Sequence, residues 1–337
     1  MSEKEMQVER NECSGKLNRN HAFDSLKLIG ALLVVFIHCH YPYKELLLPV
    51  TEVAVPLFFA ISGYFVIGSK RSWKRIRRIA LIFVGAFLLY LFKTELYWIV
   101  SKQQFYLPTL RNVFDFVFFN EVAFSIHLWY LPAYLYTLLA AYLIDKYNAW
   151  RIAFGMIIPL VLLGACLQDE INACCPENIY FYRNSYFTGL PFFLLGGVVK
   201  LYPPPISSKE SKQNVRIKVG FALLLLAVLS SVRYHLNEFS LLELLLQRLN
   251  LMFLVYTILI GVVSYSHTKD GYLSRLGRTY SLYIYIFHMI VLQVCDAFAA
   301  FLPSCMTDVY SYLNPFGIFI LTIALSYLLG KARLIHL

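Results

Sequence analysis

The stretch that decides the fold is FDSLKLIGALLVVFIHCHYP at positions 23–42. It is apolar over most of its length and long enough to cross the hydrocarbon core of a bilayer as a helix. Lys27 and His38 interrupt it eleven positions apart. Because eleven steps of about 100° come to nearly three turns, both side chains share one face, separated by about 16 Å along the axis. The stretch therefore predicts a membrane helix with one polar stripe.

Two further polar residues, Asp24 and Tyr41, lie close to the same stripe. Ionisable groups at membrane depth are costly, so the stripe suggests a functional site. A simpler interpretation stays open: Asp24 and Lys27 would anchor the helix at the interface, and His38 would be a packing residue with one hydrogen-bond partner.

The composition indicates a protein that crosses the membrane many times. Of 337 residues, 59% are hydrophobic and only 15% are charged, against about a quarter charged in soluble domains. The mean hydropathy is +0.60. No small-residue cleavage pattern follows the first apolar run, so we interpret it as a retained span. The predicted location is the cell membrane, multi-pass, with the lipid bilayer as a partner.

Apolar runs bounded by polar, proline or glycine residues predict ten spans. The fold class is accordingly all-α, a polytopic transmembrane helical bundle. The predicted spans are 23–42, 51–69, 77–100, 128–145, 151–168, 185–201, 217–235, 245–265, 279–301 and 312–331.

Basic residues predict the orientation of the bundle. An even number of spans places both termini on one side, and Lys and Arg concentrate in the loops of that side, including six of the nine positions 70–78. By the positive-inside rule, both termini are expected to be cytoplasmic. This gives a tail over 1–22, a membrane domain over 23–331 and a tail over 332–337. Topology thus explains the net charge of +10, and no nucleic-acid partner is expected.

Several catalytic signatures are absent from the sequence. It contains no GxxxxGK[ST], GxGxxG, HExxH or GxSxG, which argues against nucleotide-driven pumps, zinc proteases and the usual serine hydrolases. The seven cysteines show no metal-ligand spacing, and no metal is expected. Cys174 and Cys175 could meet Cys305 in an outer loop, although scattered free thiols are the simpler interpretation.

Polar groups at membrane depth are the remaining candidates. His127 and Trp129 open the fourth predicted span, and His288 lies near the middle of the ninth. Histidines suit general acid–base work because they titrate near neutrality, but each can equally be a packing residue. Ser62 and Gly63 lie inside the second span, where small residues allow a helix or a ligand to approach closely.

A basic cluster follows the second span, in GSKRSWKRIRRIA. On a helix Arg71, Arg75 and Arg78 share a face. Such a cluster can hold a phosphorylated cofactor by charge-assisted hydrogen bonds. The alternative is anchoring at the cytoplasmic surface with anionic lipid.

With these motifs the chain resembles the acyltransferase-3 family of ten-span membrane proteins over about 24–331. The shared features are a D-x-x-[RK] followed by ten residues and a histidine, and segments of the type VxLFFxISGY, RRxxRI, HLWYL and SLxIYLxH. In this sequence they are Asp24, Lys27 and His38, then Val55–Tyr64, Lys74–Ile79, His127–Leu131 and Ser281–His288.

The resemblance implies transfer of an acyl group, usually acetyl from acetyl-CoA, to a hydroxyl of a sugar or cell-envelope glycan. His38 would be the base or a transient acyl carrier. The residues implied to bind the donor are Lys27, Arg75, Arg78 and Asp24; those implied to form the acceptor pocket are Ser62, His127, Trp129 and His288. Two departures stand out: Lys27 replaces a commoner arginine, and Met289 stands where proline usually follows the last histidine.

A second resemblance implies a different class of function. The sequences around HLWYLPA and over Arg183–Lys200 are similar to the membrane half of membrane-bound serine racemases of vancomycin-resistance operons. That membrane half is thought to admit serine. Those proteins continue into a pyridoxal-phosphate domain, whereas this sequence ends at Leu337. That ending favours acyl transfer, unless the chain is the membrane part of a longer relative.

A third class of function also stays open: a structural membrane partner whose polar stripe only fixes helix packing. The sequence does not identify the acceptor, which could be a glycan or a small polar molecule. It also leaves homo-oligomerisation open.

Overall fold

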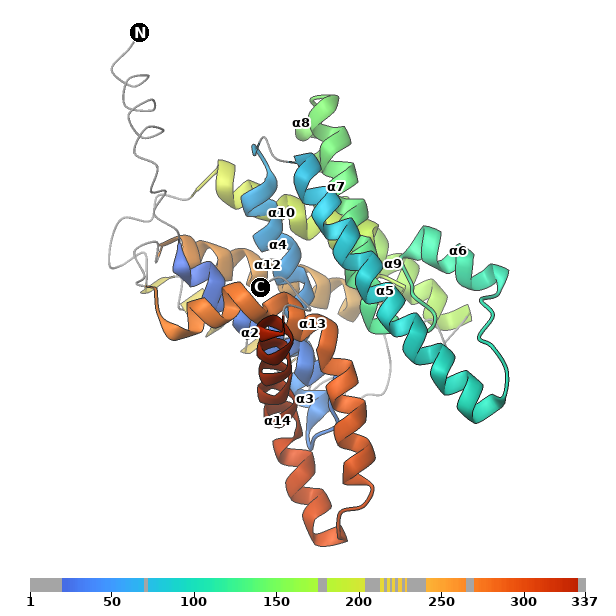
Figure 1. The fold of residues 1–337 in the computed structure, drawn as a ribbon. Coiled ribbons are helices and arrows are strands. Elements are labelled where there is room, and N and C mark those ends of the chain that lie inside the picture. Colours follow the sequence, from blue (N-terminus) through green and yellow to red (C-terminus); the bar gives the residue numbers. More distant parts are fainter. Residues whose placement is uncertain are drawn as a thin grey trace.

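A computed structural model describes residues 20–69, 72–174, 181–203, 241–264 and 270–332, together with isolated positions between 213 and 228. Over these residues the chain forms helices and connecting turns, with no strand (Figure 1). The predicted all-α class is confirmed. The tail 1–19, Arg71 and most of the predicted span 217–235 lie outside the described residues.

Helix α2 (His21–His38) is the first predicted span, but it is shorter than the apolar run. The Asn20 side chain accepts a hydrogen bond from the backbone N–H of Ala22 and so caps the helix. The helix ends at His38, and Cys39 turns to an extended conformation. The expectation of a helix to Pro42 was therefore wrong, and His38 occupies the last helical position.

The second predicted span begins earlier than expected. A separate helix, α3 (Lys44–Thr51), follows a left-handed residue, Tyr43, and precedes α4 (Ala54–Val66). Together they form an apolar candidate span over Lys44–Val66. The predicted span began only at residue 51 and did not include α3, because the two charged residues at the start of that helix lower its hydropathy.

The next helices are α5 (Ser72–Lys102), α6 (Leu110–Phe119) and α7 (Tyr130–Lys146), with a 3₁₀ turn, η1 (Ile126–Trp129), before α7. Helix α6 lies in a segment expected to be a loop. Thr109 and Asn112 bond reciprocally in a capping box at its start. Phe116 of α6 packs against Phe83 and Phe87 of α5.

In the second half of the chain the described helices overlap the predicted runs, although the last two begin seven and eight residues earlier than predicted. Its elements are α8 (Trp150–Gly155), α9 (Ile157–Cys174), the π-helical turn η3 (Ser185–Gly189), α10 (Leu190–Leu201), α12 (Leu241–Ser264), α13 (Tyr272–Ala299) and α14 (Ser304–Lys331). Among the described residues, six helical segments are long and apolar enough to cross a membrane. The count of ten spans and the cytoplasmic termini stay predictions.

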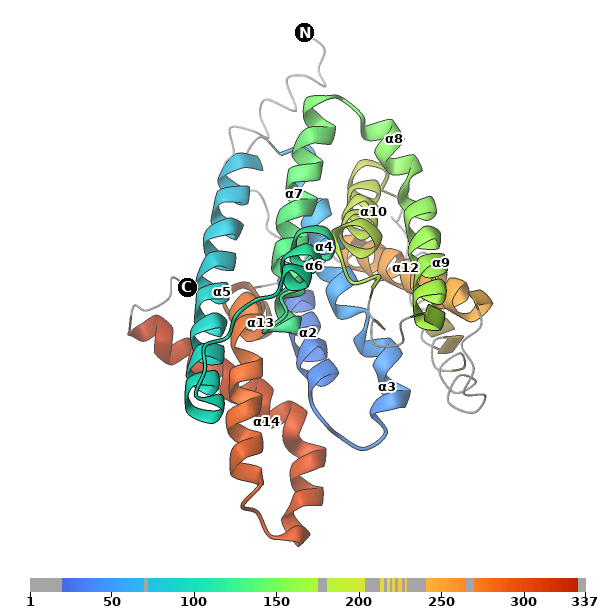
Figure 2. The same cartoon turned by 90° about the vertical axis from the view of Figure 1, so that its right-hand side faces the viewer.

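The turns of the bundle gather at two opposite ends. Both views place the α2–α3, α5–α6 and α13–α14 turns at one end and the α4–α5 and α7–α8 turns at the other (Figures 1 and 2). We call these the histidine end and the lysine end, after the positions of His38 and Lys27 on α2. Which of the two ends faces the cytoplasm stays a prediction.

Two close helix crossings hold the centre of the bundle together. Helix α4 packs on α10 at Gly63, where a Cβ would overlap the carbonyl oxygen of Phe193, and Gly196 stands in the same relation to Ala60. Helix α2 packs on α13 at Gly277, where a Cβ would overlap the carbonyl oxygen of Asp24. The packing interpretation of Gly63 is confirmed, because only glycine allows these backbones to approach so closely.

The structure tests the two interpretations of the outer-loop cysteines, pairing or free thiols, only in part. Cys174 is an exposed free thiol at the end of α9. Cys175 and the side chain of Cys305 lie outside the described part of the structure.

Candidate functional site

A cavity opens at the histidine end between α2, α4, α9, η3 and α12. It encloses about 840 Å³ of empty space, part of which is open to solvent. His38 and His127 line it together with Trp129 and Tyr285. Its walls are otherwise largely apolar, including Val34, Val55, Pro56, Val161, Phe187, Phe192 and Leu251. Such a lining suits a small ligand that must be shielded from water.

Three histidines from three distant segments meet beside this cavity. The ring centre of His38 lies 5.1 Å from that of His288 and 6.1 Å from that of His127. The rings of His127 and His288 are 5.5 Å apart and nearly perpendicular. His288 is fully buried, whereas His38 is half-buried at the cavity wall. The structure therefore brings together all three histidines that the sequence singled out.

Hydrogen bonds hold the two buried histidine rings. The Nδ1 atom of His288 lies 3.0 Å and 2.8 Å from the backbone oxygens of Ile284 and Tyr285. Because a carbonyl only accepts, Nδ1 must carry the proton, which leaves Nε2 of a neutral ring as an acceptor. Nδ1 of His127 is 3.1 Å from the Ser125 hydroxyl. The Nε2 atoms of His127 and His288 are buried without a hydrogen-bond partner among the described residues.

Tyrosines position the loop that carries His127. The Tyr285 hydroxyl donates a short hydrogen bond to the backbone oxygen of His127, and the Tyr90 ring stands edge-on to the imidazole at 4.6 Å. Tyr90 in turn donates to the backbone oxygen of Ile286 at 2.7 Å. Helices α5 and α13 thus each contact His127 in the η1 turn.

Trp129 and Ser62, two other candidates, occupy different surroundings. Trp129 lines the cavity beside His127. Ser62 is not among the described residues that line it; its hydroxyl bonds instead with the phenols of Tyr130 and Tyr134, whose rings stack 5.7 Å apart. The structure therefore separates Ser62 from the other pocket candidates.

At the lysine end, Lys27 pairs with Asp24 one helical turn away. The Nζ–Oδ1 distance is 3.1 Å, and the aspartate side chain is only 3% exposed while the lysine is 27% exposed. Lys27 also lies 5.7 Å above the ring centre of Phe65. The ammonium is thus held in place by a buried carboxylate and still reaches the surface.

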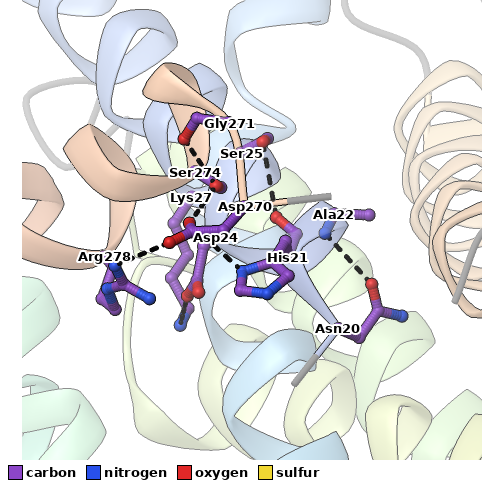
Figure 3. Close-up of polar contacts among 10 residues, drawn as sticks. All are labelled: Asn20, His21, Ala22, Asp24, Ser25, Lys27, Asp270, Gly271, Ser274 and Arg278. Carbon is purple, nitrogen blue, oxygen red and sulfur yellow. Dashed lines mark hydrogen bonds and ion pairs between the residues drawn. The ribbon is translucent and has the colours of Figure 1, made fainter. Parts of the chain in front are cut away.

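A second polar cluster stands beside this pair, where α13 begins next to α2 (Figure 3). Asp270 accepts a hydrogen bond from Ser274 at 2.9 Å and lies 3.6 Å from Arg278 and 3.4 Å from His21. The Ser274 hydrogen bond, and then the charges of Arg278 and His21, lower the pKa of Asp270. Asp270 is therefore ionised at neutral pH and ties the two helix ends together.

The other donor candidates lie on α5 near the same end. The Arg75 guanidinium donates to the Ser69 hydroxyl at 3.1 Å, and Lys200 of α10 donates to the backbone oxygen of Ile67 at 2.6 Å. Arg75 is half-buried, whereas Arg78 is exposed. Basic groups from α2, α5 and α10 are accordingly found at the lysine end, the opposite end from the cavity.

Four polar residues at the cavity mouth were missed by sequence reasoning: Glu52, Tyr182, Arg183 and Arg248. They come from the α3–α4 junction, the segment before η3, and α12. The available signal was that Arg183 and Arg248 are two of the few basic residues expected on the outer side.

The arrangement can take up a proton and return it. A half-buried imidazole at the wall of a largely apolar cavity, with two buried histidine rings beside it, suits general acid–base chemistry on a small polar group. The described residues include no group of three or more His, Cys, Asp or Glu side chains that could hold a metal ion.

Fold and site together define a class: an all-helical membrane protein with a histidine-lined cavity between its helices. Residues 20–331 match the acyltransferase-3 family, described as an acyltransferase domain. The chain therefore belongs to the acyltransferase-3 family of membrane acyltransferases.

The curated relatives have low sequence identity to this chain and are much longer than it. It is 28% identical over 229 residues to an amino-acid racemase of Enterococcus faecalis, covering 60% of this chain and 30% of that protein. It is 29% identical over 160 residues to a serine/alanine racemase of Enterococcus gallinarum, covering 43% of this chain and 22% of that protein. The chain thus spans under a third of the length of these relatives. No solved structure matches it.

Proposed function

We propose that this protein moves an acyl group, acetyl in the simplest case, from cytoplasmic acetyl-CoA to a hydroxyl of a sugar or cell-envelope glycan. The observation that carries the proposal is the position of His38 in the cavity at one end of α2, with Lys27 at the other end of the same helix. Family membership supports acyl transfer in general.

His38 would act as the general base. Its imidazole takes the proton of the acceptor hydroxyl while the hydroxyl oxygen bonds to the acyl carbon. The carbon–sulfur bond of the thioester then breaks, and the leaving thiolate takes up that proton from the imidazolium. His127 and His288, whose ring centres lie 6.1 Å and 5.1 Å from that of His38, would stabilise its orientation and the transient charge.

Lys27, Arg75 and Arg78 would hold the phosphates of the donor at the lysine end. Asp24 would position Lys27 through their ion pair. The extended arm of CoA would then run along α2 toward His38, about 16 Å from Lys27. This assigns the lysine end to the cytoplasm and the histidine end to the acceptor side, as the basic residues predict.

Mass spectrometry of cell-envelope glycans tests this function. Cells that express the protein should carry acyl-modified glycan, and cells without it should lack the modification. Purified protein in vesicles should also transfer radiolabel from [acetyl-¹⁴C]acetyl-CoA to isolated glycan. If neither product forms, acyl transfer to envelope glycans is wrong.

A second candidate function is admission of a small amino acid such as serine. The similarity to the amino-acid and serine/alanine racemases favours it. In that case vesicles containing the protein should take up radiolabelled serine without any acylated product. The cavity would then be a transport site, and His38 would not take part in covalent chemistry.

The role of Lys27 gives a prediction of its own. We expect Lys27→Met to raise the KM for acetyl-CoA by about ten- to a hundredfold with little change in kcat, because one charge-assisted contact with phosphate contributes about 1.5–3 kcal/mol. Lys27→Arg keeps the charge, retains the ion pair with Asp24 and adds a bidentate fork, so its KM should be equal or lower.

Lys102→Met is the matched control, since Lys102 is exposed at the far end of α5. Its KM should stay at the wild-type value. An unchanged KM in Lys27→Met would remove Lys27 from the donor site. The melting temperature of each variant separates this effect from loss of the Asp24 ion pair.

A further inference from the structure

The mouth of the histidine-end cavity is a built polar cluster. Glu52, Tyr182, Arg183 and Arg248 all line the same cavity as His38. They come from three separate segments, at Glu52, at the neighbours Tyr182 and Arg183, and at Arg248, so only the packing of the helices brings them together. These four residues have no part in the proposed role of the histidines, and the family match assigns them none.

Tyr182 is the centre of the cluster. Its hydroxyl donates to Oε1 of Glu52 at 3.3 Å, and its backbone N–H donates to the Gln168 side chain at 3.2 Å. The Arg248 guanidinium lies 3.4 Å from the centre of the Tyr182 ring. The ring is thus fixed from two sides and serves as a platform for a cation.

Glu52 is already engaged by several partners. Besides Tyr182, its Oε1 lies 3.8 Å from Nη2 of Arg183, and its Oε2 accepts from Gln247 at 3.4 Å. The cluster therefore contains one carboxylate and two guanidinium groups. The four cavity-mouth residues carry one excess positive charge.

Arg248 is the guanidinium that can bind a ligand, because Glu52 pairs with Arg183. Within the described parts of the chain, no carboxylate lies within ion-pair distance of it. A guanidinium stacked by its face on an aromatic ring keeps the N–H donors along its edge, which match the two oxygens of a planar carboxylate. Nearby Glu52 would repel a dianionic phosphate, so a monoanion fits the cluster better.

We propose that the cavity mouth binds a carboxylate of the acceptor through Arg248, with Arg183 adding positive charge and Tyr182 holding Arg248 in place. The acceptor would then be an acidic sugar or an amino acid, each of which carries both a carboxylate and a hydroxyl. That the bound molecule is the acyl acceptor rests on the proposed function; the binding of a carboxylate does not.

Binding of defined probes to the full chain in nanodiscs tests the proposal. The probes are glucuronate against glucose, and serine against serinamide, so that each pair differs in the carboxylate. We expect glucuronate or serine to bind at least about tenfold more tightly than its matched partner. Glucuronate identifies an acidic sugar as the source of the carboxylate, and serine an amino acid.

Arg248→Gln should weaken binding of the preferred probe by about tenfold or more, and Arg248→Lys should lie between, since it keeps the charge but not the fork. Arg111→Gln is the control, because Arg111 is exposed on α6 and pairs with Asp115. Melting temperatures show whether each variant is folded. Equal affinity for the members of both pairs, or an unchanged affinity in a folded Arg248→Gln protein, would overturn the inference.

The same measurements separate this inference from the proposed function. Carboxylate binding that depends on Arg248, without any acylated product, would keep the site and overturn acyl transfer. Acylation of an acidic glycan by Arg248→Gln at the wild-type rate and with the wild-type KM would keep acyl transfer and overturn the carboxylate site.

Discussion

Replacing His38 by glutamine is expected to lower acyl transfer by about a thousandfold, because loss of a general base typically costs 10²–10⁴ in rate. Glutamine keeps a polar side chain of similar reach at the cavity wall but cannot take up a proton. The variant should bind acetyl-CoA as the wild type does, since the donor residues lie at the other end of α2. The rate of label transfer from [acetyl-¹⁴C]acetyl-CoA to isolated glycan measures the effect.

His40→Gln is the matched control for this experiment. His40 is two positions further along but is exposed beyond the end of α2, so its rate should match that of the wild type. His127→Gln and His288→Gln should give smaller losses, because they act through His38. Full activity of a folded His38→Gln protein would contradict the catalytic role. Reduced melting temperature with no acylation in the wild type either would favour a structural role.

The largest expected loss of stability comes from the crossing of α4 and α10. Gly63→Ala places a methyl group on the carbonyl oxygen of Phe193, and neither backbone can move without separating the helices. Overpacking typically costs about 1–3 kcal/mol, and a contact with rigid backbone belongs at the upper end of that range. We expect the melting temperature in detergent to fall by roughly 5–10 °C. Thermal unfolding monitored by near-UV circular dichroism measures this change.

Gly85→Ala on α5 is the matched control, because no atom lies within 4 Å of the position of its added Cβ. Its stability should be unchanged or slightly higher, since alanine favours helix over glycine. Gly196→Ala should be as damaging as Gly63→Ala, and the double variant should lose less than the sum because both act on one crossing. A Gly63→Ala protein with the wild-type melting temperature would contradict this account of the packing.

Local features of the fold were predictable from the residues. An apolar run long enough to cross a bilayer forms a helix because only internal hydrogen bonds satisfy its backbone in lipid. The positions of Lys27 and His38 on one face followed from helical periodicity alone. The residues of the capping box, Thr109 and Asn112, stand in the sequence and could have indicated the start of α6, which was expected to be a loop.

The boundaries of the first two spans were less predictable. The apolar run continues past His38, so hydropathy alone did not indicate that α2 ends there or that α3 is a separate helix. Cys39 leaves the helix, and the left-handed residue Tyr43 turns the chain toward α3. A window of averaged hydropathy contains no information on such a turn.

The amino-acid sequence by itself determined the helical class, the apolar runs and the histidines worth testing, because these depend on neighbours along the chain. Only the tertiary structure decided that His38, His127 and His288 share one site and that Tyr182 meets Glu52, 130 residues away. The physical reason is that helices in lipid gain nothing from hiding apolar surface from one another. Their pairing depends on shape, such as the close approach at Gly63, and shape appears only when the helices are packed.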